Sequence, residues 1–196
     1  MTPMAKPKMP VTGDKAADEL LDKDPLARMI GMLLDQQVPM EWAFGAPIKL
    51  KERLGGALDA AQIASMPLEE LQVHFKGPPA LHRYPGSMAQ RTQQLCQALV
   101  DGYKGKADNV WKGVATGDEL FRRLRALPGF GEEKAKIFTA VLAKRYGIAP
   151  PGWEEKATPF SDELKRSVAD IDSPDSLAEV RAFKQRKKAA AKAKDA

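Results

Sequence analysis

The chain has 196 residues, of which 43% are apolar and 29% charged, the balance of an ordinary folded domain. Its single cysteine, Cys96, excludes an intrachain disulfide and a four-thiolate metal cluster, and with only two histidines we expect no metal centre and no cofactor. Apolar runs fall far short of the roughly 20 residues of a spanning helix, and no signal-peptide segment opens the sequence. The sequence therefore predicts a cytoplasmic protein without membrane contact.

The net charge of +5 is concentrated at the carboxyl end. Residues 181–196 hold seven of the 31 basic residues but one of the 26 acidic ones, which leaves residues 1–180 with a net charge of −1. An Ala/Lys tail of this kind can strengthen binding to a polyanion by releasing counterions, or it can serve only as a solubilising extension. Charge alone does not decide between these two roles.

The amino-terminal half reads as a series of helices. Residues 1–17 are rich in Pro, Lys and Gly and predict a flexible segment, with the ordered part opening near Asp18. An Asp-Pro start and apolar residues at helical spacing then predict a buried helix of about three turns, which Pro39 interrupts. A second apolar-periodic stretch predicts a helix over 40–54.

Shorter helices are predicted over 59–65 and 67–75, followed by a Gly/Pro-rich loop over 77–86. Ser87 is the predicted N-cap of a long helix that continues to Tyr103.

A tight helical hairpin is the most informative part of the sequence. Residues 116–119 have the form of a capping box, and Leu120, Leu124 and Leu127 form the apolar stripe of the helix that it starts. A second helix begins at Glu132, so a very short connection joins the two: Leu127, Pro128, Gly129, Phe130 and Gly131. Glycines allow such a turn, and the free amides of the second helix can bind an anion such as a DNA phosphate.

Leu-Pro-Gly-Phe-Gly followed by a Lys-Ala helix resembles the helix-hairpin-helix motif of the HhH-GPD superfamily of base-excision DNA glycosylases, whose relatives include endonuclease III and 3-methyladenine DNA glycosylase II. Residues 26–38 are similar to the early helix of that fold, and residues 84–99 are similar to the segment before the hairpin. The resemblance implies an all-α, two-lobed fold with a groove between the lobes. It also implies that residues 127–131 bind DNA and that Gln37 probes the duplex.

The lysine position of this motif departs from the family pattern. In bifunctional members, the residue two positions after the last hairpin glycine is a lysine that forms a Schiff base with the sugar, and here that residue is Glu133. Lys134 lies one residue further, about 100° around a helix, so we do not carry the lyase role over to it. Lys134 is instead expected to contact a phosphate or to be a solvated surface charge.

The carboxylate of the family is also displaced. The family places an aspartate shortly after the second hairpin helix, whereas here Glu154 and Glu155 come a few residues late and Asp162 is a third possibility. Either glutamate can serve as the catalytic carboxylate if the loop brings it beside the anomeric carbon. The alternative is an exposed pair that flanks Trp153.

Aromatic and amide side chains supply the remaining candidates. Tyr84 and Trp153 lie in predicted loops and are candidates for stacking an extruded base, whereas Trp42 and Phe44 are expected in the core. Gln36 and Gln37 either cap backbone carbonyls or form a wedge that enters the duplex. His82 and Arg83 either bracket a turn or reach a phosphate.

Together these features predict an amino-terminal segment over 1–17, a helical HhH-GPD-like domain over 18–172 with its hairpin over 118–146, and a helix with a basic tail over 173–196. The predicted function is that of a monomeric, monofunctional DNA glycosylase acting on a damaged or mispaired base in double-stranded DNA. The alternative is a non-catalytic module that binds DNA or lesions and has kept the fold. A third, weaker interpretation is a helical scaffold for a protein partner.

Overall fold

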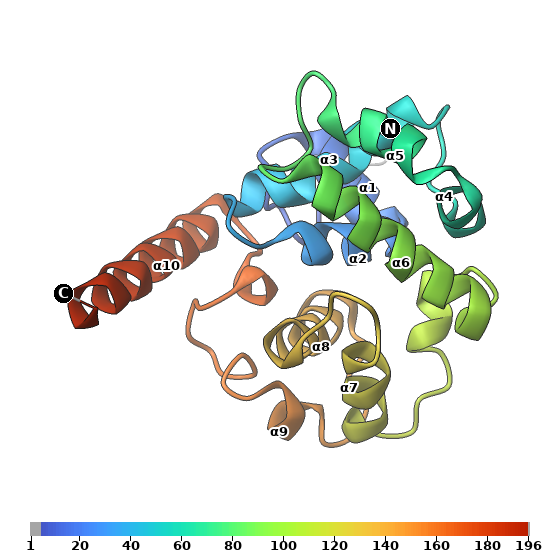
Figure 1. Cartoon of the computed structure of the whole chain (residues 1–196). Coiled ribbons are helices and arrows are strands. Elements are labelled where there is room, and N and C mark those ends of the chain that lie inside the picture. The colour runs from blue at the N-terminus through green and yellow to red at the C-terminus, as the bar shows by residue number, and fades with distance from the viewer. Residues whose placement is uncertain (1–4, 196) are drawn as a thin grey trace.

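The computed structural model describes residues 5–195, and this part of the chain is all-α, without a β-strand (Figure 1). The helices follow one another as α1 (Lys15–Lys23), α2 (Pro25–Leu34), α3 (Met40–Arg53), α4 (Ala60–Ser65), α5 (Leu68–Lys76), α6 (Pro85–Tyr103), α7 (Gly117–Arg125), α8 (Glu132–Tyr146), α9 (Trp153–Ala157) and α10 (Pro174–Lys194). Two short 3-10 helices, η1 (Ala107–Val110) and η2 (Val168–Asp170), lie between them. None of the helices within residues 5–195 combines the length and the apolarity needed to cross a membrane.

The helices form two groups that meet at α2. In the first group, α3 packs against α1 and α2, and α6 packs against α4 and α5. In the second group, α7, α8 and α9 pack against one another, and η2 packs on α8. Helix α2 contacts both η1 and α8, and α10 carries the chain back toward the first group before it projects from the body (Figure 1).

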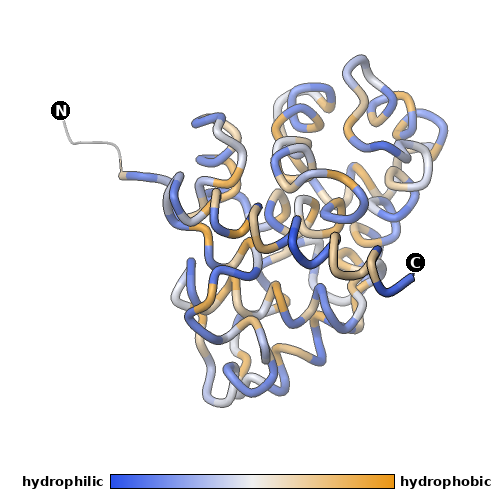
Figure 2. Tube along the Cα trace, turned by 90° about the vertical axis from the view of Figure 1, so that its left-hand side faces the viewer, coloured by the Kyte–Doolittle hydropathy of each residue, from blue (hydrophilic) through white to orange (hydrophobic). Residues whose placement is uncertain are grey.

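Helix α2 is the centre of a core shared by both groups. Every residue from Leu26 to Leu34 is buried, including Arg28. The Arg28 guanidinium lies 3.9 Å from the centre of the Tyr146 ring at the end of α8, a cation–π contact that joins the two groups. Elsewhere hydrophilic and hydrophobic residues alternate along the helices, as expected where one side of each helix faces the core (Figure 2).

The amino-terminal segment packs on the domain earlier than its composition indicates. Residues 1–4 lie outside the described part, but Met9 and Val11 are fully buried in the core, and α1 already begins at Lys15. The Thr12 amide and hydroxyl both donate to the buried Asp18 carboxylate, at 3.0 and 2.8 Å. Two apolar residues in a Pro/Lys-rich context therefore anchor a segment that we had expected to be loose through residue 17.

The first predicted helix is confirmed, and one predicted helix start moves. Helix α2 ends at Leu34 after about three turns, and the residues between Leu34 and Pro39 form a turn. The long helix begins at Pro85, with Tyr84 at the N-cap, so Ser87 lies inside the first turn and is not the cap. The capping threonine is as predicted: Thr116 accepts from the Glu119 amide at 3.1 Å.

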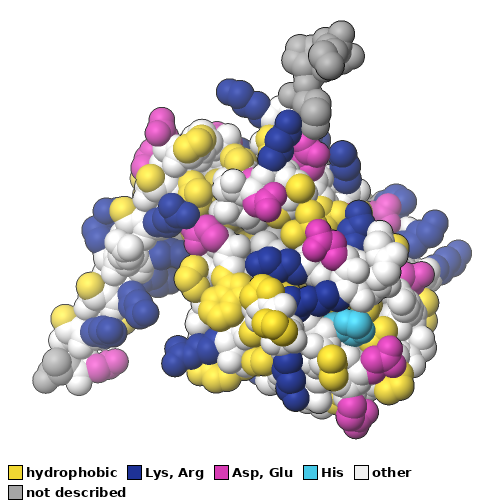
Figure 3. Space-filling model, turned by 90° about the horizontal axis from the view of Figure 1, so that it is seen from above, with side chains coloured by type: hydrophobic (Ala, Val, Ile, Leu, Met, Phe, Trp, Pro, Cys, Tyr) yellow, Lys and Arg dark blue, Asp and Glu magenta, His cyan; other side chains and the backbone are white. Residues whose placement is uncertain are grey.

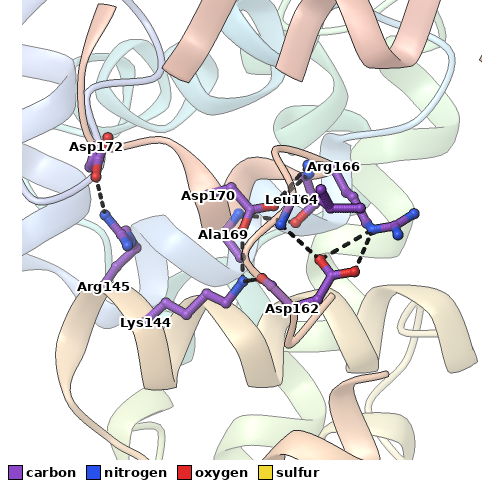
Figure 4. Close-up of polar contacts among 9 residues, drawn as sticks. Lys144, Arg145, Asp162, Leu164, Arg166, Ala169, Asp170 and Asp172 are labelled. Carbon is purple, nitrogen blue, oxygen red and sulfur yellow. Dashed lines mark hydrogen bonds and ion pairs between the residues drawn. The ribbon is translucent and has the colours of Figure 1, made fainter. Parts of the chain in front are cut away.

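A polar network holds the segment between α9 and α10 against the end of α8 (Figure 4). The Lys144 ammonium donates to the Asp170 carboxylate at 2.7 Å and to the backbone carbonyl of Asp162. The second Asp170 oxygen accepts from the backbone amides of Arg166 and Ser167, each at 3.0 Å. These contacts fix the irregular residues 162–170 beside α8.

The hairpin between α7 and α8 is pressed against α2. Gly129 has a left-handed φ of +80°, and a Cβ added there would lie 2.2 Å from Leu33 Cδ1. Leu33 is fully buried, so its side chain would have to shift within the packed core to make room. Gly129 therefore allows both the sharp turn and the close approach to α2.

We expect Gly129→Ala to lower the free energy of unfolding more than Gly147→Ala. Gly147 has a similar φ of +70° but nothing within 4 Å of an added Cβ, so it measures the backbone cost alone, about 1–2 kcal/mol. The clash with Leu33 adds about 1–3 kcal/mol for Gly129→Ala. Urea unfolding measures both variants, and equal losses would contradict the close packing of the hairpin on α2.

Candidate functional site

The candidate site is built around the carboxyl end of α2. After Leu34 the chain turns through Asp35, Gln36 and Gln37, and Gln37 has a left-handed φ of 58°, uncommon for a residue with a side chain. Gln37 is exposed at the tip of this turn. The end of α2 leaves backbone carbonyls without helical partners, and these carbonyls organise the surrounding side chains.

Lys134 reaches this turn from the first turn of α8. Its ammonium donates to the Leu33 carbonyl at 2.6 Å and to the Gln36 side-chain carbonyl at 2.8 Å. Lys134 is thus half-buried between the two helix groups and is not the solvated surface charge that the sequence allowed. Burial lowers the pKa of Lys134 to about 8, although the nearby Asp35 carboxylate opposes the shift.

Asp35 is the acidic partner in this region. Its side chain is only 8% exposed, and Lys184 of α10 lies 3.5 Å from one carboxylate oxygen. Burial raises the pKa of Asp35, against the opposing effect of the positive charges on Lys184 and Lys134. A buried carboxylate and a buried amine therefore lie near each other with their pKa values shifted in opposite directions.

Both groups line a pocket of about 340 Å³ between α2, α8, α10 and the segment that follows α9. Its apolar walls include the rings of Phe160 and Phe183, and Arg166 and Ser167 border it beside Asp35 and Lys134. Apolar walls with a few convergent polar groups of shifted pKa are typical of small-molecule sites. The volume is at the small end of such sites.

His82 fixes the loop before α6 to the same turn. Its Nε2 lies 3.1 Å from the Leu34 carbonyl and 3.0 Å from the Gln36 carbonyl, and its Nδ1 accepts from the Tyr84 amide at 3.0 Å. These partners require the neutral ring with its proton on Nε2. Burial is the main cause that lowers the pKa of His82. His82 therefore holds the turn, and Arg83 and Tyr84 remain at the surface.

A larger cleft of about 820 Å³ adjoins this pocket on the other side of Lys184. It lies between α10, the 37–41 turn and the loop before α6, and its lining includes Gln37, Arg83, Tyr84, Arg181 and Lys188. Figure 3 looks down on the face of the 77–84 loop, where hydrophobic side chains gather among Lys and Arg side chains, which also follow the projecting α10.

The predicted hairpin residues 127–131 do not line the pocket, but they lead directly into the start of α8, which lines it through Glu133 and Lys134. Leu127 and Phe130 are buried, and Phe130 contacts Phe138 edge-on at 5.8 Å between ring centres. Gly131 is the N-cap of α8 with no side-chain cap, so the amides of the first turn are open to a ligand. Pro128 is half-buried.

The predicted carboxylates lie elsewhere. Glu154 and Glu155 are exposed on α9, which packs on α7 and α8, and neither lines the pocket or the cleft. Trp153 is half-buried against the core next to Gly117, away from both cavities. Asp162 is engaged by Arg166 at 2.9 Å. The structure thus brings Gln37, Tyr84 and Lys184 to one cavity but does not bring the glutamates there.

Aromatic residues also differ from expectation. Phe44 is in the core as predicted, but Trp42 is 37% exposed, and its indole N–H donates to the Ala80 carbonyl at 3.0 Å. Sequence reasoning missed Asp35, Phe160 and Phe183 as site residues. Asp35 carried a signal, since it is an acidic residue directly after an apolar helix, but the two phenylalanines are indistinguishable from core residues by pattern.

Comparison of the chain with protein-family models, with curated proteins and with solved structures gives no match in any of the three. The geometry of the site is therefore the basis for assigning a function.

We expect acidification below about pH 6.5 to destabilise the protein through His82. The pKa of His82 is lowered in the folded state, so the unfolded state binds more protons there, and the free energy of unfolding decreases as the pH falls. His82→Gln removes this pH dependence, whereas His74→Gln, at the only other histidine, retains it. Urea unfolding between pH 7.5 and about 5 checks this; parallel profiles for the wild type and His82→Gln would refute it.

We expect the Lys134 ammonium to titrate near pH 8 and Asp35→Asn to lower its pKa further, because the carboxylate is the charge that opposes the burial effect. Nitrogen-15 NMR of the lysine side chains measures this directly. Asp101→Asn, at an exposed carboxylate on α6, is the matched control and should leave the Lys134 titration unchanged. An unchanged Lys134 pKa in Asp35→Asn would show that the Asp35 carboxylate does not influence the Lys134 ammonium.

Proposed function

We propose that this protein is a monofunctional DNA glycosylase that binds double-stranded DNA and hydrolyses the N-glycosidic bond of a base extruded into the pocket at Asp35 and Lys134. The observation that carries the proposal is this pocket, in which a buried carboxylate and a half-buried amine lie between aromatic walls, beside the hairpin. The chemistry is assigned to Asp35 in place of Glu154 and Glu155, because those glutamates point to solvent on α9.

The hairpin supports the binding part of the proposal. The uncapped amides at the start of α8 can donate to one DNA phosphate. Glu132 and Glu133 in the same turn oppose an anion, but each already has a cation nearby, Lys136 at 3.2 Å and Lys187 at 3.6 Å. On this proposal a phosphate binds to the backbone and these lysines together.

The turn after α2 supports base extrusion. Gln37 stands exposed in a left-handed conformation at the edge of the cleft, where its amide can occupy the space that an extruded nucleotide leaves. Phe160 and Phe183 offer apolar faces to the base. Extrusion costs a few kcal/mol and least at a damaged or mispaired base, which selects such bases before any contact is made.

Asp35 and Lys134 have different roles in the proposed reaction. The ionised Asp35 carboxylate activates water or stabilises the cationic sugar of the transition state, and no metal takes part in this step. The positive charges of Lys184 and Lys134 oppose the effect of burial on the Asp35 pKa and so favour the ionised carboxylate. Because burial raises the pKa of Asp35, activity should decline as the pH falls through that raised pKa.

A non-catalytic module that binds DNA or lesions is the second candidate function. The observation that favours it is that both reacting groups already have protein partners. Lys134 is held by Leu33 and Gln36, and Asp35 is paired with Lys184. A purely structural role for these contacts would leave the pocket without chemistry.

Single-turnover base release from a panel of lesion-bearing duplexes tests the proposal. We expect release by the wild type and by Glu154→Gln and Glu155→Gln, and a loss of about 100-fold or more in Asp35→Asn. Anisotropy on the same duplexes checks that Asp35→Asn still binds. Wild-type binding without base release would support the non-catalytic module. Loss of activity in Glu154→Gln or Glu155→Gln, with activity retained in Asp35→Asn, would instead make a glutamate of α9 the catalytic carboxylate.

Borohydride trapping separates the two roles possible for Lys134. A monofunctional enzyme gives no covalent complex with DNA, and Lys134→Met then loses activity through the pKa of Asp35, with its pH profile shifted upward. A trapped complex that disappears in Lys134→Met would make Lys134 a nucleophile and would contradict the monofunctional proposal.

A further inference from the structure

The cleft beside Tyr84 has the features of a site for single-stranded nucleic acid, which the proposed base-release chemistry does not use. Tyr84 is 45% exposed and lines the cleft, whereas Trp42 is 37% exposed and lies outside the cleft lining. The ring centres of Trp42 and His82 are 6.5 Å apart, and those of His82 and Tyr84 are 6.1 Å apart. Two exposed aromatic side chains thus neighbour one fixed imidazole.

The Trp42 ring and the backbone of Tyr84 are held in place before any ligand binds. The Trp42 indole is fixed to the Ala80 carbonyl, and the Tyr84 backbone is fixed to His82, which is itself anchored to the end of α2. Rings that are already ordered lose little conformational freedom when a base stacks on them. Exposed aromatic rings without this anchoring are common on protein surfaces and carry no such implication.

Positively charged side chains surround Tyr84 in the cleft. Arg83, Arg181, Lys184 and Lys188 line the cleft, and the Arg83 guanidinium lies 5.7 Å from the centre of the Tyr84 ring. Arg181 and Lys184 are paired with Glu41 and Asp35, whereas Arg83 and Lys188 have no ion pair within residues 5–195. Two cations are therefore available to phosphates without breaking an ion pair.

We propose that this cleft binds a single strand of nucleic acid, with a base stacked on Tyr84, the strand continuing toward Trp42, and its phosphates on Arg83 and Lys188. A basic groove interleaved with aromatic rings is the pattern by which proteins bind single strands without reading their sequence. A volume of about 820 Å³ lies within the range of small-molecule pockets and is large enough for an individual nucleotide. The inference goes beyond the proposed function and stands or falls separately from base release.

Fluorescence anisotropy with a labelled oligothymidylate of about 12 nucleotides tests the site, with a duplex of the same length as comparison. We expect Tyr84→Ala to weaken binding of the single strand roughly 5- to 100-fold and binding of the duplex much less. Tyr84→Phe should bind like the wild type, since stacking needs the ring and not the hydroxyl. Leu164→Ala, at an exposed residue outside the cleft, should also leave binding unchanged.

Salt dependence and tryptophan fluorescence locate the ligand. Arg83→Gln should reduce the slope of log K against log salt by roughly 0.7, the value for one phosphate of a single strand. Binding should quench the tryptophan emission, and Trp42→Phe should remove most of the quenching, whereas Trp111→Phe, at a buried tryptophan, should retain it.

Three results would overturn the inference: equal affinity of Tyr84→Ala and the wild type for the single strand, equal losses for single strand and duplex, or a loss in Tyr84→Phe as large as in Tyr84→Ala. Because Tyr84 is largely exposed, its truncation leaves the core intact, and circular dichroism confirms folding of each variant. Base release that fails while single-strand binding depends on Tyr84 would refute the proposed function alone. Base release without Tyr84-dependent binding would refute this inference alone.

Discussion

The carbonyl groups at the end of α2 must be satisfied, and the surrounding architecture follows from that requirement. Helix α2 ends at Leu34 inside the protein, where water cannot reach all of its free carbonyls. Lys134 donates to the Leu33 carbonyl, and His82 lies within hydrogen-bonding distance of the Leu34 and Gln36 carbonyls. A cation at the carboxyl end of a helix is also favoured by the helix dipole. One helix end thus joins the hairpin of the second helix group to the loop before α6.

The same contacts give the site its electrostatic character. An ammonium group used to satisfy a buried carbonyl loses part of its hydration, which lowers the pKa of Lys134. The carboxylate that follows α2 is buried by the same turn, and α10 brings Lys184 to it. The same arrangement of side chains therefore provides hydrogen-bond partners for the end of α2 and shifts the pKa values of Lys134 and Asp35.

Local patterns predicted the helices and the hairpin well, because caps, prolines and glycines act within a few residues of where they stand. Pro39, Thr116 and Gly129 are examples. The site was less predictable because its contacts span the chain: Lys134 and Leu33 are 101 residues apart, and Lys184 and Asp35 are 149 apart. The contacts of Lys134 with α2 were not predicted, because helical periodicity gives the direction of a side chain but not what lies opposite it. Glu154 and Glu155 were chosen by spacing along the chain, whereas α9 turns them toward solvent.

The basic carboxyl end takes two different roles within one helix. Arg181, Lys184 and Lys187 pair with Glu41, Asp35 and Glu133 of the body, so this part of α10 closes the pocket and neutralises its acidic rim. Arg186, Lys188, Lys192 and Lys194 have no ion pair within residues 5–195, and their charges remain available to a polyanion. A phosphate that approaches the paired cations must compete with carboxylates, whereas one that approaches the unpaired cations releases only counterions. On the proposals made above, a nucleic acid therefore engages the unpaired cations on the outer part of α10 more readily than the paired cations beside the pocket at Asp35.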